Sequence, residues 1–323
     1  MENDILFLIG FVAALILMLV GMPLFIRFLK KREINQVTSE YALVEFKNKE
    51  KTPIMGGLLF VVIPVIVFFC IDRMAFTDKK ALFIALSYLL YCSVGFIDDA
   101  LVIRSHTNDG LSPWTRLGME LLYTSLLFYF FKDILPLQVT IPFLHIHIVL
   151  PWFIYLPFMI LLYMAEANAV NFTDGMDGLC AGVSFIALLP VVIFSLHEDW
   201  HIALLLVCIL AGLLGYLRFN FHPARIFMGD SGSLALGALF ASTGLLFDKC
   251  FALFFIGGVF VIEMFCVVLQ QVSVRLFHKR IFSYTPIHYA FVLKGFRESN
   301  IVLNFYLLAM ILSLIGLFIG LHT

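Results

Sequence analysis

Long apolar runs are the feature that most constrains this chain. They recur along its 323 residues, of which 62% are hydrophobic and only 13% are charged. A helix needs about 20 predominantly apolar residues to cross a bilayer core of roughly 30 Å, whereas a soluble domain carries nearer a quarter of charged residues. The pattern predicts an all-α polytopic membrane protein, which we treat as one integral-membrane domain over residues 1–323.

Ten runs are predicted to span the membrane. In chain order they are Ile5–Leu29, Ile54–Ile71, Ala81–Ile97, Met119–Leu135, Val149–Met164, Leu179–Leu196, Ile202–Leu217, Ser231–Phe247, Phe251–Leu276 and Ile301–Leu321. The first run is too long for a signal-peptide core and lacks a small-residue cleavage site, so we expect it to be retained. Between the fourth and fifth runs, Pro136–His147 alternates polar and apolar residues, which indicates a small periplasmic hairpin.

The distribution of basic residues predicts the orientation. Sixteen of the 21 Lys and Arg residues fall in the odd-numbered loops, among them Lys30, Lys47 and Lys49 in the first loop. Cytoplasmic loops carry an excess of Lys and Arg. We therefore expect the odd-numbered loops in the cytoplasm and both termini on the outer side.

Carboxylates gather at span ends on that same side. Asp98 and Asp99 follow the third run, Asp174 and Asp177 lie in the loop before the sixth, and Asp230 precedes the eighth. Converging carboxylates repel one another, and Mg²⁺, a hard ion that prefers oxygen ligands, would neutralise them. No cysteine–histidine cluster has zinc spacing.

Each feature also has a purely structural interpretation. Asp177 and Asp230 could cap the helices that follow them, and the Asp98-Asp99 pair could be a solvated helix end. His288 could be an interfacial histidine. Glu263, inside the ninth run, is expected to accept a hydrogen bond from another helix. The functional interpretation depends on four polar loops falling on one side.

The motifs resemble those of a known family. Asp98-Asp99, the segment Asn168–Leu179 and the segment Phe227–Ser233 resemble the polyprenyl-phosphate N-acetylhexosamine-1-phosphate transferases. The segments Thr52–Gly57 and Lys279–Gly295 resemble the branch of phospho-N-acetylmuramoyl-pentapeptide transferases. The resemblance extends from about Lys51 to the last run.

The resemblance implies a ten-helix enzyme of the bacterial inner membrane with its active site facing the cytoplasm. Its substrates would be UDP-N-acetylmuramoyl-pentapeptide and undecaprenyl phosphate, its products lipid I and UMP, and its cofactor Mg²⁺. Membrane lipid would surround it, nucleic acid would play no part, and a homodimer is left open.

The resemblance also implies residue roles. Asp98, Asp99, Asp230 and His288 would be catalytic, and Asp230 would also be the metal ligand. Substrate contacts would come from Lys51, Asn171, Asp174, Asp177, Asn220 and Phe227. Asp98 follows the third run directly, so its position makes it the candidate base for the lipid phosphate; the alternative is that it only helps to orient metal or phosphate. Asp99 should face elsewhere because adjacent helical residues do not share a face.

Two positions depart from the family pattern. Tyr289 and Ala290 stand where the branch usually has histidines, and Val102 stands where the family tends to have a lysine. The alternatives are a sister transferase that uses UDP-N-acetylglucosamine, and an ion-coupled transporter, whose carboxylates would lie nearer the bilayer midplane.

Overall fold

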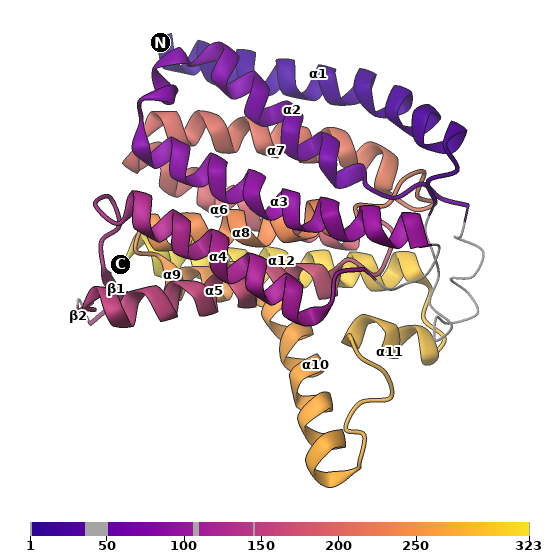
Figure 1. Cartoon of the computed structure of the whole chain (residues 1–323). Helices are drawn as coiled ribbons and strands as arrows, with labels where there is room; N and C mark the ends of the chain where they lie inside the picture. The colour runs from indigo at the N-terminus through magenta and orange to yellow at the C-terminus, as the bar shows by residue number, and fades with distance from the viewer. Residues whose placement is uncertain (1, 36–50, 106–109, 145, 323) are drawn as a thin grey trace.

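The computed structural model describes residues 2–35, 51–105, 110–144 and 146–322, so Lys47 and Lys49 lie outside it. The described residues form a helical bundle (Figure 1). Ten of its helices overlap the ten predicted spans: α1 (Glu2–Lys31), α2 (Gly56–Ile71), α3 (Lys79–Ser105), α4 (Pro113–Phe131), α5 (Trp152–Thr173), α6 (Leu179–Glu198), α7 (Trp200–Asn220), α8 (Asp230–Leu246), α10 (Gly258–Phe277) and α12 (Glu298–Leu321). Seven of the ten are long and apolar enough to cross a membrane. The prediction of an all-α polytopic membrane protein is confirmed.

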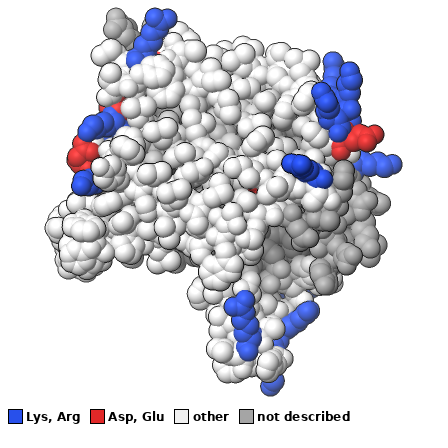
Figure 2. Space-filling view, viewed as in Figure 1, with Lys and Arg blue, Asp and Glu red and all other residues white. Residues whose placement is uncertain are grey.

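Charged side chains gather at the two ends of the bundle. Figure 2 shows Lys, Arg, Asp and Glu side chains at opposite ends, with a largely uncharged surface between them, and a further group of Lys and Arg side chains on the projection formed by the end of α10. The largely uncharged surface is the one expected of helices surrounded by hydrocarbon, because charge in the bilayer core is costly. Which end faces the cytoplasm stays a prediction.

Three helices extend past the predicted C-terminal ends of their spans and carry candidate site residues that were expected in loops; one is α7, which includes Asn220. Helix α3 continues to Ser105, so Asp98 and Asp99 lie inside a helix and not in a loop. Asn168 and Asn171 likewise lie on α5 and not in the following loop. The reason is that polar side chains facing a protein interior need not end an apolar helix. Hydropathy alone ends the span where these residues begin.

The ninth span is wrong as a single helix. The chain forms a short helix α9 (Cys250–Ile256) and then α10, with the break at Gly257. The pair Gly257-Gly258 has weak helix propensity, which favours a break there. Figure 1 shows α10 leaving the bundle at an angle, and the chain then returns through α11 (Ile287–Leu293) toward the site end.

Helix α8 lies at the centre of the bundle. Every residue from Ser231 to Leu246 is buried, and the helix packs against α3, α5 and α2. Two glycines permit the close approach. A Cβ on Gly95 of α3 would lie 2.1 Å from the backbone carbonyl of Asp230, and one on Gly57 of α2 would lie 2.3 Å from the backbone nitrogen of Gly232.

The predicted hairpin is present. Strands β1 (Gln138–Ile141) and β2 (Ile146–Val149) pair antiparallel. Asp248, beyond the far end of α8, accepts hydrogen bonds from the backbone of Thr140 (3.0 Å) and from the side chain of Gln138 (2.8 Å). The hairpin is therefore fixed to the end of the bundle opposite Asp230. A short 3₁₀ helix, Arg73–Phe76, connects α2 to α3.

Candidate active site

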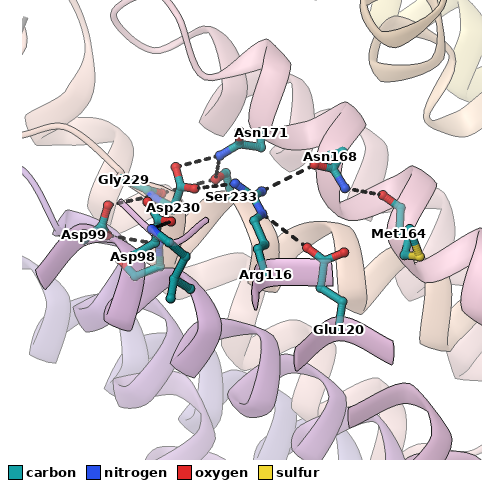
Figure 3. A network of polar contacts seen from close by, with 12 residues as sticks. Asp98, Asp99, Arg116, Glu120, Met164, Asn168, Asn171, Gly229, Asp230 and Ser233 are labelled. Atoms are coloured by element: carbon teal, nitrogen blue, oxygen red, sulfur yellow. Dashed lines mark hydrogen bonds and ion pairs between the residues drawn. The ribbon is translucent and has the colours of Figure 1, made fainter. Parts of the chain in front are cut away.

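Asp230 is the centre of a polar network at one end of the bundle (Figure 3). Asp230 is the first residue of α8. The N-cap residue is Gly229, so the interpretation of Asp230 as the N-cap is wrong. One carboxylate oxygen accepts a hydrogen bond from Asn171 Nδ2 at 2.8 Å, and the other lies 2.9 Å from Arg116 Nη1. The side chain is 24% exposed, so a ligand can reach it.

The two neighbouring aspartates of α3 have different surroundings, as predicted. Asp99 is buried, and its oxygens accept hydrogen bonds from the backbone N–H groups of Asp230 (3.0 Å) and Ser231 (3.1 Å). It therefore caps α8 in place of Gly229, whose side chain cannot. Asp98 instead accepts a hydrogen bond from the backbone of Leu111 at 2.8 Å and stays partly exposed.

Asp174 is the residue directly after α5 and lies next to the network around Asp230. Burial, with the negative charge of Asp230 nearby, raises its pKa to about 7, although a hydrogen bond from the Gly229 backbone partly offsets this. This carboxyl group is therefore more readily protonated near neutral pH than an exposed aspartate.

Asp177 and Asn220 brace the loops beside this network. Asp177 accepts hydrogen bonds from His222 Nδ1 (2.9 Å) and the Ala224 backbone (3.0 Å), while its own N–H donates to Glu298 (2.8 Å). Asn220 accepts a hydrogen bond from the backbone of Gly178 and donates one to the backbone of Ile226. Gly178, and not Asp177 as the sequence suggested, is the N-cap residue of α6.

The trio Asp177, His222 and Glu298 is the one group of possible metal-ligand atoms found within 4.8 Å of one another in the described part of the chain. It does not include Asp230. Its atoms already bond to one another and to the Ala224 backbone, so we interpret it as a brace between loops.

Phe227 is held by the segment that follows Lys51. The Phe227 N–H donates to the carbonyl of Pro53 at 2.8 Å, and the Phe227 carbonyl accepts from Gly56 N at 2.8 Å. Two segments far apart in sequence thus pair beside the start of α8. Lys51 is exposed two residues before Pro53, so its side chain is free to reach a ligand over this loop.

His288 approaches the site from α11. Its Nδ1 lies 3.0 Å from Glu263 Oε1 of α10, and Glu263 also accepts a hydrogen bond from the backbone of Ile287. The expected hydrogen bond from another helix to Glu263 is confirmed. The other ring nitrogen, Nε2, is buried without a hydrogen-bond partner and faces Gly175, next to Asp174: a Cβ on Gly175 would lie 2.2 Å from it.

Comparison with known proteins fits this geometry. Residues 81–248 match the sequence model of glycosyl transferase family 4. The chain is 36% identical over 315 residues to the phospho-N-acetylmuramoyl-pentapeptide-transferase of Thermoanaerobacter sp. strain X514, covering 97% of this chain and 96% of that protein. It is 36% identical over 317 residues to the protein of that name from Staphylococcus aureus strain bovine RF122, covering 96% and 98%. The chain belongs to glycosyl transferase family 4. Its full-length relatives assign it to the phospho-N-acetylmuramoyl-pentapeptide-transferase branch of that family.

The departures from the family pattern can now be located. Tyr289 donates a hydrogen bond to the carbonyl of Gly175 at 3.0 Å, so it fastens α11 to the turn after Asp174. Ala290 is buried. At the position of the missing family lysine, Val102 provides no charge, and the cation beside Asp230 comes from Arg116 on α4.

Sequence reasoning therefore missed Arg116 and its partner Glu120 as site residues, along with Asn168 and Ser233. Asn168 Oδ1 lies 3.5 Å from Arg116 Nη2, and Ser233 Oγ lies 2.9 Å from Asn171 Nδ2. Asn168 and Ser233 stand at the ends of the motif segments Asn168–Leu179 and Phe227–Ser233 but were given no role. For Arg116 the available signal was the absent lysine near Asp99, because a group of carboxylates without a cation is unstable. It did not say which arginine would compensate.

Proposed function

We propose that this chain transfers phospho-N-acetylmuramoyl-pentapeptide from its UDP carrier to undecaprenyl phosphate, forming lipid I and UMP. The observation that carries the proposal is the meeting of Asp98, Asp99, Asp174 and Asp230 at one end of a membrane bundle. One substrate is soluble and the other is a lipid, so the chemistry belongs at a membrane surface. Similarity over nearly the whole length to transferases of this name supports the substrate pair.

Magnesium is the proposed cofactor, and the residues fit it. The carboxylates supply hard oxygen donors, and the partly exposed Asp230 side chain already faces one cationic group, Arg116, through Oδ2. Asp230 would hold the ion, together with substrate phosphates. The ion would supply charge neutralisation and alignment at the phosphates, as is usual in phosphoryl transfer.

The protein's own groups have separable roles in this proposal. Asp98 is the candidate base for the acceptor phosphate, because it is partly exposed. Asp99 positions Asp230 through the first turn of α8. His288, held by Glu263, stays the candidate active-site histidine; its Nε2 is buried against the turn after Asp174, so substrate binding would have to open this turn before a phosphate could reach it. Lys51 and Phe227 are assigned to the nucleotide.

The side of the membrane is part of the proposal. Nucleotide sugars are made in the cytoplasm, and the Asp230 end of the bundle carries Lys30 and Lys31 at the end of α1. The excess of basic residues in these loops favours the cytoplasmic side of the bacterial inner membrane.

The decisive experiment supplies purified protein with undecaprenyl phosphate, Mg²⁺ and one of two donors. UDP-N-acetylmuramoyl-pentapeptide should be converted to a lipid product and UMP, and much faster than UDP-N-acetylglucosamine. EDTA should stop the reaction and Mg²⁺ restore it. Asp230→Asn should fold and be inactive. Full activity without metal would disprove the magnesium assignment.

The second candidate is the sister reaction with UDP-N-acetylglucosamine. It is favoured by one observation, the replacement of usual histidines by Tyr289 and Ala290 beside His288. The donor comparison separates the two, because preference for UDP-N-acetylglucosamine would move this chain to the sister branch. A transporter is disfavoured, since the carboxylates gather at one end of the helices.

A further inference from the structure

Arg116 is shared between two carboxylates. Its Nη1 lies 2.9 Å from Asp230 Oδ2 on α8, and its Nε lies 3.3 Å from Glu120 Oε1, one turn further along α4. A weaker contact joins Nη2 to Asn168 Oδ1 at 3.5 Å. Figure 3 shows the guanidinium lying between Asp230 and Glu120.

The two carboxylates hold the guanidinium in different ways. Glu120 is buried, with only 2% of its side chain exposed, whereas Asp230 is 24% exposed. A buried carboxylate that lost its cation would be left without compensation, which is costly. The contact with Glu120 is therefore the permanent one. The contact with Asp230 is open to competition from solvent.

A divalent cation at Asp230 would compete with Arg116 Nη1 for Oδ2, because Oδ1 already accepts a hydrogen bond from Asn171 Nδ2. Two cations at one carboxylate oxygen repel each other, and the ion with two charges gains more from the surrounding aspartates. When the ion binds, Arg116 loses Asp230 but keeps Glu120. The planar guanidinium has five N–H donors in a fixed fork that suits phosphate oxygens, so the freed Nη1 needs an anion.

We propose that Arg116 is a resident counterion of the empty site, which gives Asp230 up to the divalent cation and then, still held by Glu120, binds a phosphate oxygen of a substrate. This inference rests on the proposed function. The phosphate could belong to the nucleotide diphosphate or to the prenyl phosphate, which share the same oxyanion chemistry. Glu120 acts as a positioning residue that keeps the guanidinium beside the site throughout the exchange.

The first test measures Mn²⁺ binding to purified protein without substrates, from the spectrum of free Mn²⁺ in electron paramagnetic resonance. Arg116→Gln removes the competitor, so Mn²⁺ should bind about fivefold more tightly, the fold-change for losing an ion pair of roughly 1 kcal/mol. Arg104→Gln is the matched control, because Arg104 is an exposed arginine in the last turn of α3. It should leave the affinity unchanged.

Glu120→Gln tests the same exchange with the opposite sign. With one carboxylate partner neutralised, the guanidinium should stay on Asp230 and Mn²⁺ should bind more weakly than to wild type. This variant also keeps the proposal testable if Arg116→Gln does not fold. An unchanged or weaker affinity in folded Arg116→Gln, or an unchanged or tighter one in Glu120→Gln, overturns the exchange.

A second measurement identifies the phosphate. At saturating Mn²⁺, Arg116→Gln should raise KM for the UDP-sugar if the guanidinium binds the diphosphate, or KM for undecaprenyl phosphate if it binds the lipid. Unchanged values of both contradict the second half of the proposal. If wild type and Asp230→Asn bind Mn²⁺ equally weakly, the metal site of the proposed function is disproved as well. If Mn²⁺ binding depends on Asp230 but does not change in Arg116→Gln, only the exchange at Arg116 is disproved.

Discussion

Replacing Asp99 by alanine should destabilise the protein as well as inactivate it. Asp99 accepts two backbone N–H groups at the start of α8. Ser231 is fully buried, so its orphaned N–H should cost about 1–3 kcal/mol. Asp230 is partly exposed, and water can replace part of its lost bond, which leaves about 0.5–1.5 kcal/mol. The total is about 1.5–4.5 kcal/mol, reduced somewhat by the loss of repulsion between Asp99 and Asp230.

The assay is the apparent melting temperature in detergent, followed by tryptophan fluorescence, alongside Mg²⁺-dependent turnover. Asp99→Ala should melt several degrees below wild type. The matched control is Asp98→Ala, which removes one acceptor from the part-buried N–H of Leu111 and should lower the melting temperature by less than half as much. If Asp99→Ala is inactive but melts with wild type, the capping role is wrong and Asp99 acts only in the chemistry.

Four further outcomes follow from the structure. Gly95→Ala should misfold or lose activity, because its Cβ would meet the Asp230 backbone at 2.1 Å; a variant with normal melting and turnover would contradict the packing of α3 on α8. The rate of Asp98→Asn relative to wild type should recover between about pH 6 and 9.5 if Asp98 is the base, since a phosphate monoester has its second pKa near 6; a flat ratio retires that role. Since the raised pKa of Asp174, about 7, exceeds the unfolded value near 3.9, its ionisation removes stability as pH rises through this window. In EDTA, the melting temperature of Asp174→Asn relative to that of wild type should therefore rise from about pH 5 to 8. A relative melting temperature that falls over this range would contradict a raised pKa for Asp174. Single cysteines after α1 and after α10 should react only with reagents on the cytoplasmic side; labelling from outside would invert the topology.

The fold was largely predictable from hydropathy, but its interruptions were not. Spans match helices because apolar length is a local property. The break at Gly257 was missed because Phe251–Leu276 is apolar throughout, and where a helix leaves a bundle depends on what it packs against. The third span was predicted to end too early for the opposite reason, because two adjacent aspartates interrupt an apolar run. Asp98 and Asp99 look like a helix terminus in the sequence, and only the position of α8 shows that they face protein.

The candidate site was predictable in membership and less so in roles. Asp98, Asp99, Asn171, Asp174 and Asp230 do come together around the start of α8. Their division of labour depends on which backbone or side chain each carboxylate meets, and that is a three-dimensional fact.

Arg116 shows the same limit for cations. In sequence it is one of 21 Lys and Arg residues, counted only toward topology. Its contact with Asp230 joins residues 114 positions apart, and no local pattern encodes such a pair.

The complete burial of α8 has a consequence for how the protein is made. A helix that enters a membrane one segment at a time must first be tolerated by lipid, yet α8 carries Ser231, Ser233, Ser242 and Thr243 on a stretch of only 17 residues. Its neighbours α2, α3 and α5 precede it in the chain. They are therefore available to pack against α8 as it is inserted, and we expect the polar side chains of α8 to be buried by protein and not left in lipid.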